Sequence, residues 1–95
     1  MQIIKSNEYE AWENALRDER AHARINARIR RLGLGNPGDA KSVGGGVCEM
    51  RIDYGPGYRV YYTRRGMEIV VLLVGGDKST QRRDIARAKE IAASI

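Results

Sequence analysis

Residues 47–76 read VCEMRIDYGPGYRVYYTRRGMEIVVLLVGG, and this stretch decides the fold of the chain. Apolar and polar side chains alternate in residues 47–53 and again in 58–64, which is the pattern of β-strands with one buried face. The apolar run 67–74 is long enough for a central strand. Turns that contain glycine separate the three segments, and we expect Gly75-Gly76 to end the sheet.

The alternation also predicts which side chains share a face of this sheet. If Arg65 and Gly66 are the two loop residues of the last hairpin, Tyr62 lies opposite Ile69 and Val60 lies opposite Val71. The expected core face consists of Cys48, Met50, Ile52, Val60, Tyr62, Ile69 and Val71. The opposite face presents Glu49, Arg51, Arg59 and Tyr61. Because these groups are polar or cationic, we expect that face to be a surface and not a core.

Helical patterns precede the predicted strands. Asn7 is the expected N-cap of a first helix that carries Tyr9, Trp12 and Leu16 at helical spacing. A second helical run follows, and glycine with Pro37 stops it. Its expected buried face consists of Ala21, Ile25, Ile29 and Leu32. The glycine-rich residues 33–46 are expected to hold no regular structure.

A last helix follows the predicted sheet. Asp77 or Ser79 is its expected N-cap, and its expected shared face consists of Ile85, Ala88, Ala92 and Ile95. Residues 2–4 can form a short first strand. The predicted element order is therefore β-α-α-β-β-β-α, an α+β fold with a small, mostly antiparallel sheet packed on helices. We expect residues 1–95 to form a single domain.

Composition excludes several classes of protein. The chain has no apolar run long enough to span a membrane, and Lys5 and acidic residues interrupt the N-terminal apolar run, so we expect no signal peptide. A single cysteine, Cys48, allows no internal disulfide, and a single histidine, His22, argues against a protein-ligated zinc or haem. We expect a cytoplasmic protein without a metal or another cofactor.

Positive charge is concentrated in the second helical run. The net charge of the chain is +5, and residues 17–31 hold six arginines against Asp18 and Glu19. A planar guanidinium suits phosphate and base edges better than a lysine does. The chain is therefore a candidate binder of nucleic acid or of an acidic protein, and the alternative is a solvated helix face.

The second half of the chain carries a more specific pattern. Residues 48–52 read CEMRI, residues 57–62 read GYRVYY, and residues 72–81 read LLVGGDKSTQ before Asp84-Ile85 and Ala88. In this combination the chain resembles the RelE/ParE toxin superfamily, and within it the phage-derived, HigB-like addiction module killer proteins. The resemblance covers the whole chain, including Trp12 and the arginine-rich second helix.

The resemblance implies a function. It implies the toxin of a type II toxin–antitoxin system that cleaves messenger RNA on the translating ribosome without a metal ion. In such toxins the 2′-hydroxyl of the RNA attacks the adjacent phosphate, which leaves a cyclic phosphate and a free 5′-hydroxyl. A cognate antitoxin neutralises the toxin, and we expect a helix-turn-helix protein from the adjacent gene that forms an oligomer with this chain.

Phosphodiester cleavage needs cations for the charged phosphate oxygens. Arg59 matches the family's catalytic arginine after glycine-tyrosine, and its alternative role is an ion pair with Glu49 or Asp53. Arg51 matches a basic position that the family has on the preceding strand, and it lies on the same predicted face as Arg59. Lys78 follows the glycine pair at a helix start, where an anion is favoured, and its alternative is a solvated lysine.

The proton carriers are open at this stage, because arginine is not a base at ordinary pH. The candidates are Glu49, Tyr61, Lys78 and His22, of which we expect His22 to be an exposed helix residue. Further arginines are candidate contacts to ribosomal RNA or to the message, or form a face that an acidic antitoxin covers. They are Arg20, Arg24, Arg28, Arg30 and Arg31 in the second helix and Arg65 in the hairpin.

Two other functions remain compatible with the sequence. The first is a ParE-like poison of DNA gyrase, because one fold can host both activities. Retention of Arg51, Arg59 and Lys78 argues against it, since a gyrase poison needs no phosphate-cleaving face. The second is a non-catalytic module that binds RNA or protein through the same basic surface.

Overall fold

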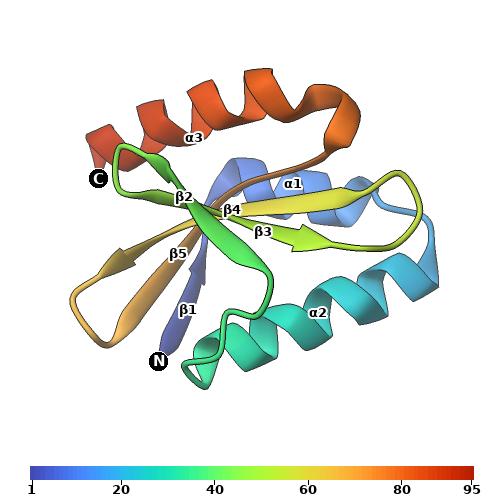
Figure 1. Ribbon diagram of the computed structural model, residues 1–95, viewed down its shortest axis with the longest axis horizontal. Helices are drawn as coiled ribbons and strands as arrows, with labels where there is room; N and C mark the ends of the chain where they lie inside the picture. Colours follow the sequence, from blue (N-terminus) through green and yellow to red (C-terminus); the bar gives the residue numbers. More distant parts are fainter.

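The computed structural model describes residues 1–95 and has an α+β fold with three α-helices and a five-stranded mixed sheet (Figure 1). The strands are β1 (Gln2–Lys5), β2 (Ala40–Gly44), β3 (Val47–Ile52), β4 (Tyr58–Arg65) and β5 (Ile69–Asp77). The helices are α1 (Asn7–Ala15), α2 (Glu19–Gly33) and α3 (Gln81–Ser94), and a 3-10 turn, η1 (Lys78–Thr80), precedes α3. The sheet order is β1-β5-β4-β3-β2, and β1 pairs with β5 in parallel.

Helices cover both faces of the sheet. Figure 1 shows α3 along one side of the sheet and α2 along the other. One core lies under α1 and α2, and it includes the predicted buried face of α2, which is thus confirmed. A second core of Val47, Tyr61, Leu73, Val74 and Ala88 lies under α3, joined by the half-buried Ile85, Ile91 and Ala92. The burial of these apolar groups stabilises the contact of α3 with the sheet.

The prediction of an open polar face is therefore wrong for half of that face. Glu49 and Tyr61 are fully buried beneath α3, while Arg51 remains exposed and Arg59 is half-buried. Alternation along a strand says which side chains share a face, but it does not say whether a distant helix covers that face. The terminal Ile95 is exposed and takes no part in the packing of α3.

A strand, β2, replaces part of the connection that was expected to lack regular structure. β2 pairs with β3 in antiparallel fashion, so that Ala40 lies opposite Met50. Gly45 and Gly46 form the turn between them, with φ of +63° and +76°. Positive φ at both central residues is the geometry of a tight hairpin turn, and glycine adopts it without strain. The glycines thus build a hairpin, and the element order gains one strand.

The register of the last hairpin also differs from the prediction. Arg65 pairs with Ile69, so the loop has three residues in place of two, and Tyr62 lies opposite Leu72. A shift of this size moves side chains to the other face. Accordingly Val70 and Leu72 lie in the core under α1 and α2, where Ile69 and Val71 were expected. A bulge follows, because Tyr61 pairs with Val74 and leaves Leu73 as the extra residue.

The helices begin one or more residues away from the predicted caps. Ser6, and not Asn7, caps α1 by accepting a hydrogen bond from the Tyr9 N–H at 3.0 Å. Asp77 caps η1 through the Ser79 N–H at 2.8 Å, while α3 itself begins after Thr80 without a side-chain cap.

No helix combines the length and the apolar character that crossing a bilayer requires.

Gly75 and Gly76 lie within β5 and do not end the sheet. A Cβ atom at Gly75 would lie 2.0 Å from the Trp12 ring, and one at Gly76 would lie 1.9 Å from Asp84 Oδ2. Gly75 thus lets α1 pack on one face of the sheet, and Gly76 lets the start of α3 pack on the other. This close approach, rather than a turn, explains the glycine pair.

We predict that Gly75→Ala destabilises the fold by about 3 kcal/mol, because the new methyl group overlaps the Trp12 ring. Chemical denaturation measures the change in the free energy of unfolding. Gly33→Ala is the control, since a Cβ there meets Ile3 at an ordinary 3.6 Å. Equal stability of the two variants would contradict this account of the packing.

Candidate nucleic-acid site

The pairing of β3 with β4 brings two predicted site arginines together. Arg51 lies directly opposite Arg59 in the antiparallel ladder, so both side chains leave the same face of the sheet, as their positions in the strands predicted. Both line a cleft of about 370 Å³ with Lys78 of η1. The remaining lining residues are Asp39, Ile52, Asp53 and Gly57. We call this the Arg59 cleft.

Two of the three guanidinium nitrogens of Arg59 face protein acceptors, and the third, Nη2, is free. Its Nη1 donates to the carbonyl oxygens of Gly57 at 2.9 Å and Tyr58 at 3.3 Å. Its Nε lies 3.9 Å from Glu49 Oε1, and 12% of its side chain is exposed. Nη2 has no hydrogen-bond partner. A guanidinium fixed in this way can donate from Nη2 to an anion in the cleft with little loss of side-chain entropy.

Arg51 already has an anionic partner. Its Nη2 donates to Asp39 Oδ1 at 2.8 Å, and its Nε donates to the same oxygen at 3.2 Å. The Arg51 guanidinium lowers the pKa of the Asp39 carboxyl below its usual value. Arg28 fixes the loop that carries Asp39, because it donates to the carbonyl oxygens of Pro37, Asp39 and Arg51. An incoming phosphate would have to compete with Asp39 for Arg51.

Glu49 and Tyr61, both candidate proton carriers, lie beneath the Arg59 cleft. The Tyr61 hydroxyl donates to Glu49 Oε2 at 2.9 Å, and Gln81 Nε2 of α3 donates to the same oxygen at 2.8 Å. Burial, and then the hydrogen bond to Glu49, raise the pKa of Tyr61 well above its usual value. Sequence reasoning did not single out Gln81, whose only signal was its place at the end of the GGDKSTQ run.

Lys78 and Asp53 complete the ionisable groups of the cleft. Lys78 is exposed and forms no ion pair, and its Cβ lies 3.5 Å from the Cβ position of Gly57. Asp53 is exposed and also has no ion-pair partner.

His22, the remaining candidate proton carrier, lies outside the Arg59 cleft. The prediction that His22 is exposed is wrong, because it is half-buried, with its Nε2 2.7 Å from the Leu16 carbonyl oxygen.

The structure divides the other predicted arginines into free and engaged groups. Arg20, Arg30 and Arg31 are exposed without an ion-pair partner, and Arg24 stacks over the Tyr54 ring at 4.7 Å. Arg28 is engaged by the loop of Asp39, and Arg65 donates to the Ala92 and Ile95 carbonyl oxygens at the end of α3. A groove of about 270 Å³ continues the Arg59 cleft along α2. The two share Ile52 and Asp53, and the groove adds Arg24, Ala27, Arg28 and Arg31.

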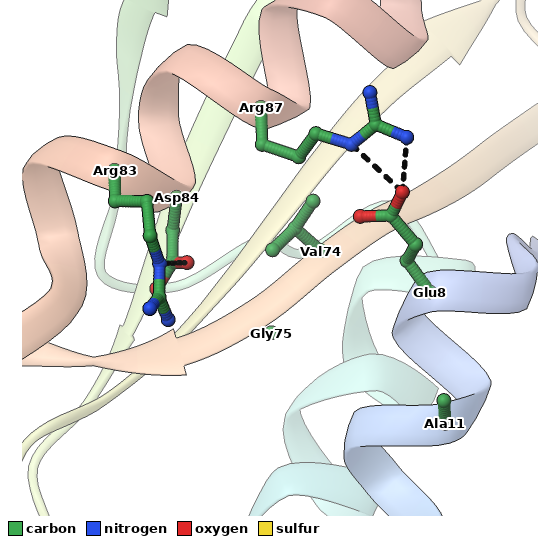
Figure 2. Close-up of a pocket in the computed structure, with 7 residues that line it drawn as sticks. All are labelled: Glu8, Ala11, Val74, Gly75, Arg83, Asp84 and Arg87. Atoms are coloured by element: carbon green, nitrogen blue, oxygen red, sulfur yellow. Dashed lines mark hydrogen bonds and ion pairs between the residues drawn. The ribbon is translucent and has the colours of Figure 1, made fainter.

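A larger cleft of about 440 Å³ lies between α1 and α3 (Figure 2). In Figure 2 the Arg87 guanidinium points at the Glu8 carboxylate, and Arg83 Nε points at Asp84 at 3.5 Å. Each cation of this cleft therefore faces its own carboxylate, and none of the predicted site residues lines it. The Arg59 cleft is the better candidate site, because Lys78 and Arg59 Nη2 stay available to a ligand.

We predict that Asp39→Asn tightens the binding of a short single-stranded oligonucleotide several-fold, because the group that competes with phosphate for Arg51 loses its negative charge. Fluorescence anisotropy at fixed ionic strength measures the Kd. Asp53→Asn is the matched control, since it removes the same charge from the same cleft without releasing an arginine. Equal gains in the two variants would show that only net charge matters and that the Asp39–Arg51 pair does not restrict the site.

The sequence is similar to that of known proteins. The family described as phage-derived protein Gp49-like (DUF891) matches residues 12–93, a range that includes every residue of the Arg59 cleft. A protein of Haemophilus influenzae, described as an uncharacterized protein, is 50% identical over 95 residues, which is 100% of this chain and 96% of the relative. This chain therefore belongs to the Gp49-like family of phage-derived proteins.

Proposed function

We propose that this protein is the toxin of a type II toxin–antitoxin system and that it cleaves messenger RNA on the ribosome. The observation that carries the proposal is the cleft in which Arg51, Arg59 and Lys78 meet from three different elements. Membership of the Gp49-like family supports a toxin, because this family is similar to the RelE and HigB toxins. We also propose that the protein belongs to the HigB-like branch of these toxins.

In the proposed reaction the scissile phosphate lies in the Arg59 cleft. The 2′-oxygen of the preceding ribose attacks phosphorus while the bond to the 5′-oxygen breaks, which leaves a cyclic phosphate. Negative charge grows on the non-bridging oxygens in the transition state. Arg59 Nη2 and Lys78 Nζ stabilise this charge, and Arg51 joins them when the phosphate replaces Asp39. The nucleophile belongs to the RNA, so the proposed reaction needs no metal-bound hydroxide to attack phosphorus.

Two proton transfers accompany this displacement. Tyr61 is a poor donor to RNA, because it is fully buried and its proton is held by Glu49. Lys78 is the exposed acid in the cleft, and we assign to it the proton that the leaving 5′-oxygen receives. The unpaired Asp53 carboxylate accepts the proton of the 2′-hydroxyl. Positioning by the ribosome supplies much of the rate enhancement, so modest acid and base groups suffice.

The groove along α2 extends the proposed RNA site. Exposed arginines at Arg20, Arg24 and Arg31 contact phosphates of the message or of ribosomal RNA, and Tyr54 under Arg24 offers a face on which a base can stack. Binding through these cations weakens steeply as salt rises. Arg28 and Arg65 act differently, since their guanidinium groups hold a loop and the end of α3.

We predict that Arg59→Ala lowers the rate of message cleavage by about a hundredfold or more, because the best-placed donor to the phosphate is lost. Primer extension on messages after brief induction of the toxin measures cleavage. Only 12% of the Arg59 side chain is exposed, and its loss leaves the buried Glu49 carboxylate without its cation, so circular dichroism must show that the variant is folded. Arg64→Ala is the control, because Arg64 is an exposed cation of the same strand outside the cleft.

Other outcomes separate the alternative functions. A ParE-like gyrase poison would leave messages intact and inhibit DNA supercoiling with or without Arg59. A non-catalytic binding module would show no cleavage with the natural sequence. Either result contradicts the proposed endonuclease.

We also predict that an adjacent gene encodes a small helix-turn-helix antitoxin that forms an oligomer with this chain. Sequencing of the flanking DNA identifies the gene, and co-expression should abolish toxicity and yield a stable complex. Arg59→Ala should leave the affinity for the antitoxin unchanged. A flanking region without such a gene contradicts the pairing but not the cleavage activity.

A further inference from the structure

We infer that Gln81 and Glu49 are positioning residues, which fix the Arg59 guanidinium from below while its Nη2 faces the cleft. The inference rests on the proposed function, in which Arg59 binds the scissile phosphate. It assigns to Glu49 a role different from that of a general base. It also gives α3 a part in the site through a residue that does not itself line the cleft.

Burial prevents Glu49 from reaching the RNA. Its side chain is completely buried, and both hydrogen bonds that it accepts, from Tyr61 and Gln81, go to Oε2. The other oxygen, Oε1, is buried and has no hydrogen-bond partner, and the same is true of Arg59 Nε. These two unpaired atoms face each other at 3.9 Å. A buried carboxylate and a guanidinium at this distance attract each other, and the attraction orients the guanidinium.

Gln81 orients the carboxylate in turn. It is the first residue of α3, and the start of this helix is fixed on the sheet, because Thr80 Oγ1 donates to Asp84 Oδ2 at 2.5 Å and Asp84 packs against Gly76. Gln81 Nε2 and the Tyr61 hydroxyl hold Oε2 from two sides, which leaves Oε1 toward Arg59. The high pKa of Tyr61 agrees with a hydroxyl that keeps its proton and donates it to this oxygen.

Two of the three guanidinium nitrogens of Arg59 then face protein acceptors. Nη1 is satisfied by the carbonyl oxygens of Gly57 and Tyr58, and Nε faces Glu49. Nη2 alone is left for phosphate. Active-site hydrogen bonds are often long in the free enzyme and tighten with substrate. We therefore expect the 3.9 Å contact between Nε and Oε1 to shorten to a hydrogen bond when RNA is bound.

The sharpest test is Glu49→Gln. An amide whose carbonyl oxygen replaces Oε2 still accepts from Tyr61 and Gln81, whereas its NH₂ group replaces Oε1 and meets the Nε–H of Arg59 donor to donor. The variant thus keeps the buried hydrogen bonds and loses the contact with Arg59. We expect kcat for ribosome-dependent cleavage to fall about tenfold, the equivalent of one hydrogen bond to a charged group. KM should not rise, because a negative charge beneath the cleft is removed.

Gln81→Met is the second variant, and Arg82→Gln is the matched control. Methionine keeps the length of the Gln81 side chain and its helical propensity but cannot donate to Glu49, so kcat should fall in the same direction. Arg82 is the exposed neighbour in α3, and its change should leave kcat at the natural value. If Gln81 and Glu49 are merely structural, any loss of activity will follow the loss of folded protein, and Glu49→Gln will keep the natural kcat.

A measurement on Arg59 itself decides the inference without catalysis. The ¹⁵N heteronuclear NOE of the Arg59 Nε–H group, assigned with Arg59→Lys, should report a rigid guanidinium in the natural protein. The NOE should fall in Glu49→Gln and in Gln81→Met and stay high in Arg82→Gln. An unchanged NOE in Glu49→Gln overturns the positioning role. Absence of cleavage by the natural protein would instead refute the proposed function, whatever the NOE.

Discussion

The antiparallel pairing of β3 with β4 sets two cations, Arg51 and Arg59, directly opposite each other on one face of the sheet. Neighbouring guanidinium groups repel each other, and the fold counters this with one carboxylate for each of them. Asp39 meets Arg51 from the loop before β2, and Glu49 lies under Arg59. The two carboxylates differ in burial, so Asp39 can yield to a phosphate while Glu49 stays in place. The remaining features of the site follow from this arrangement.

Local patterns in the sequence predicted the parts of the fold that depend on neighbouring residues. The period of two in β3 and β4 placed Arg51 and Arg59 on one face, and the helical spacing of Ala21, Ile25, Ile29 and Leu32 gave the buried side of α2. The α+β class followed from the order of these elements. The resemblance to toxin sequences indicated Arg51, Arg59 and Lys78, which line one cleft.

Features that depend on contacts between distant residues were not predicted. One residue in the β4–β5 loop and the extra Leu73 changed the pairing of every residue beyond them, and no periodicity reveals a bulge. The glycines at 44–46 looked like a break, although the turn they form creates β2. Glu49 and Tyr61 were assigned to the surface because the packing of α3 on the sheet depends on contacts between parts of the chain far apart in sequence. Gln81 was missed for the same reason.

The central claim is that a scissile phosphate lies between Arg51, Arg59 and Lys78. A structure of the protein on a ribosome, with a message that lacks the 2′-hydroxyl at the cleavage position, tests this most directly because the substrate stays intact. We expect a phosphate oxygen within hydrogen-bond distance of Arg59 Nη2 and of Lys78 Nζ, with Arg51 released from Asp39. A message whose phosphates all lie outside this cleft, with the Arg51–Asp39 pair unbroken, would contradict it.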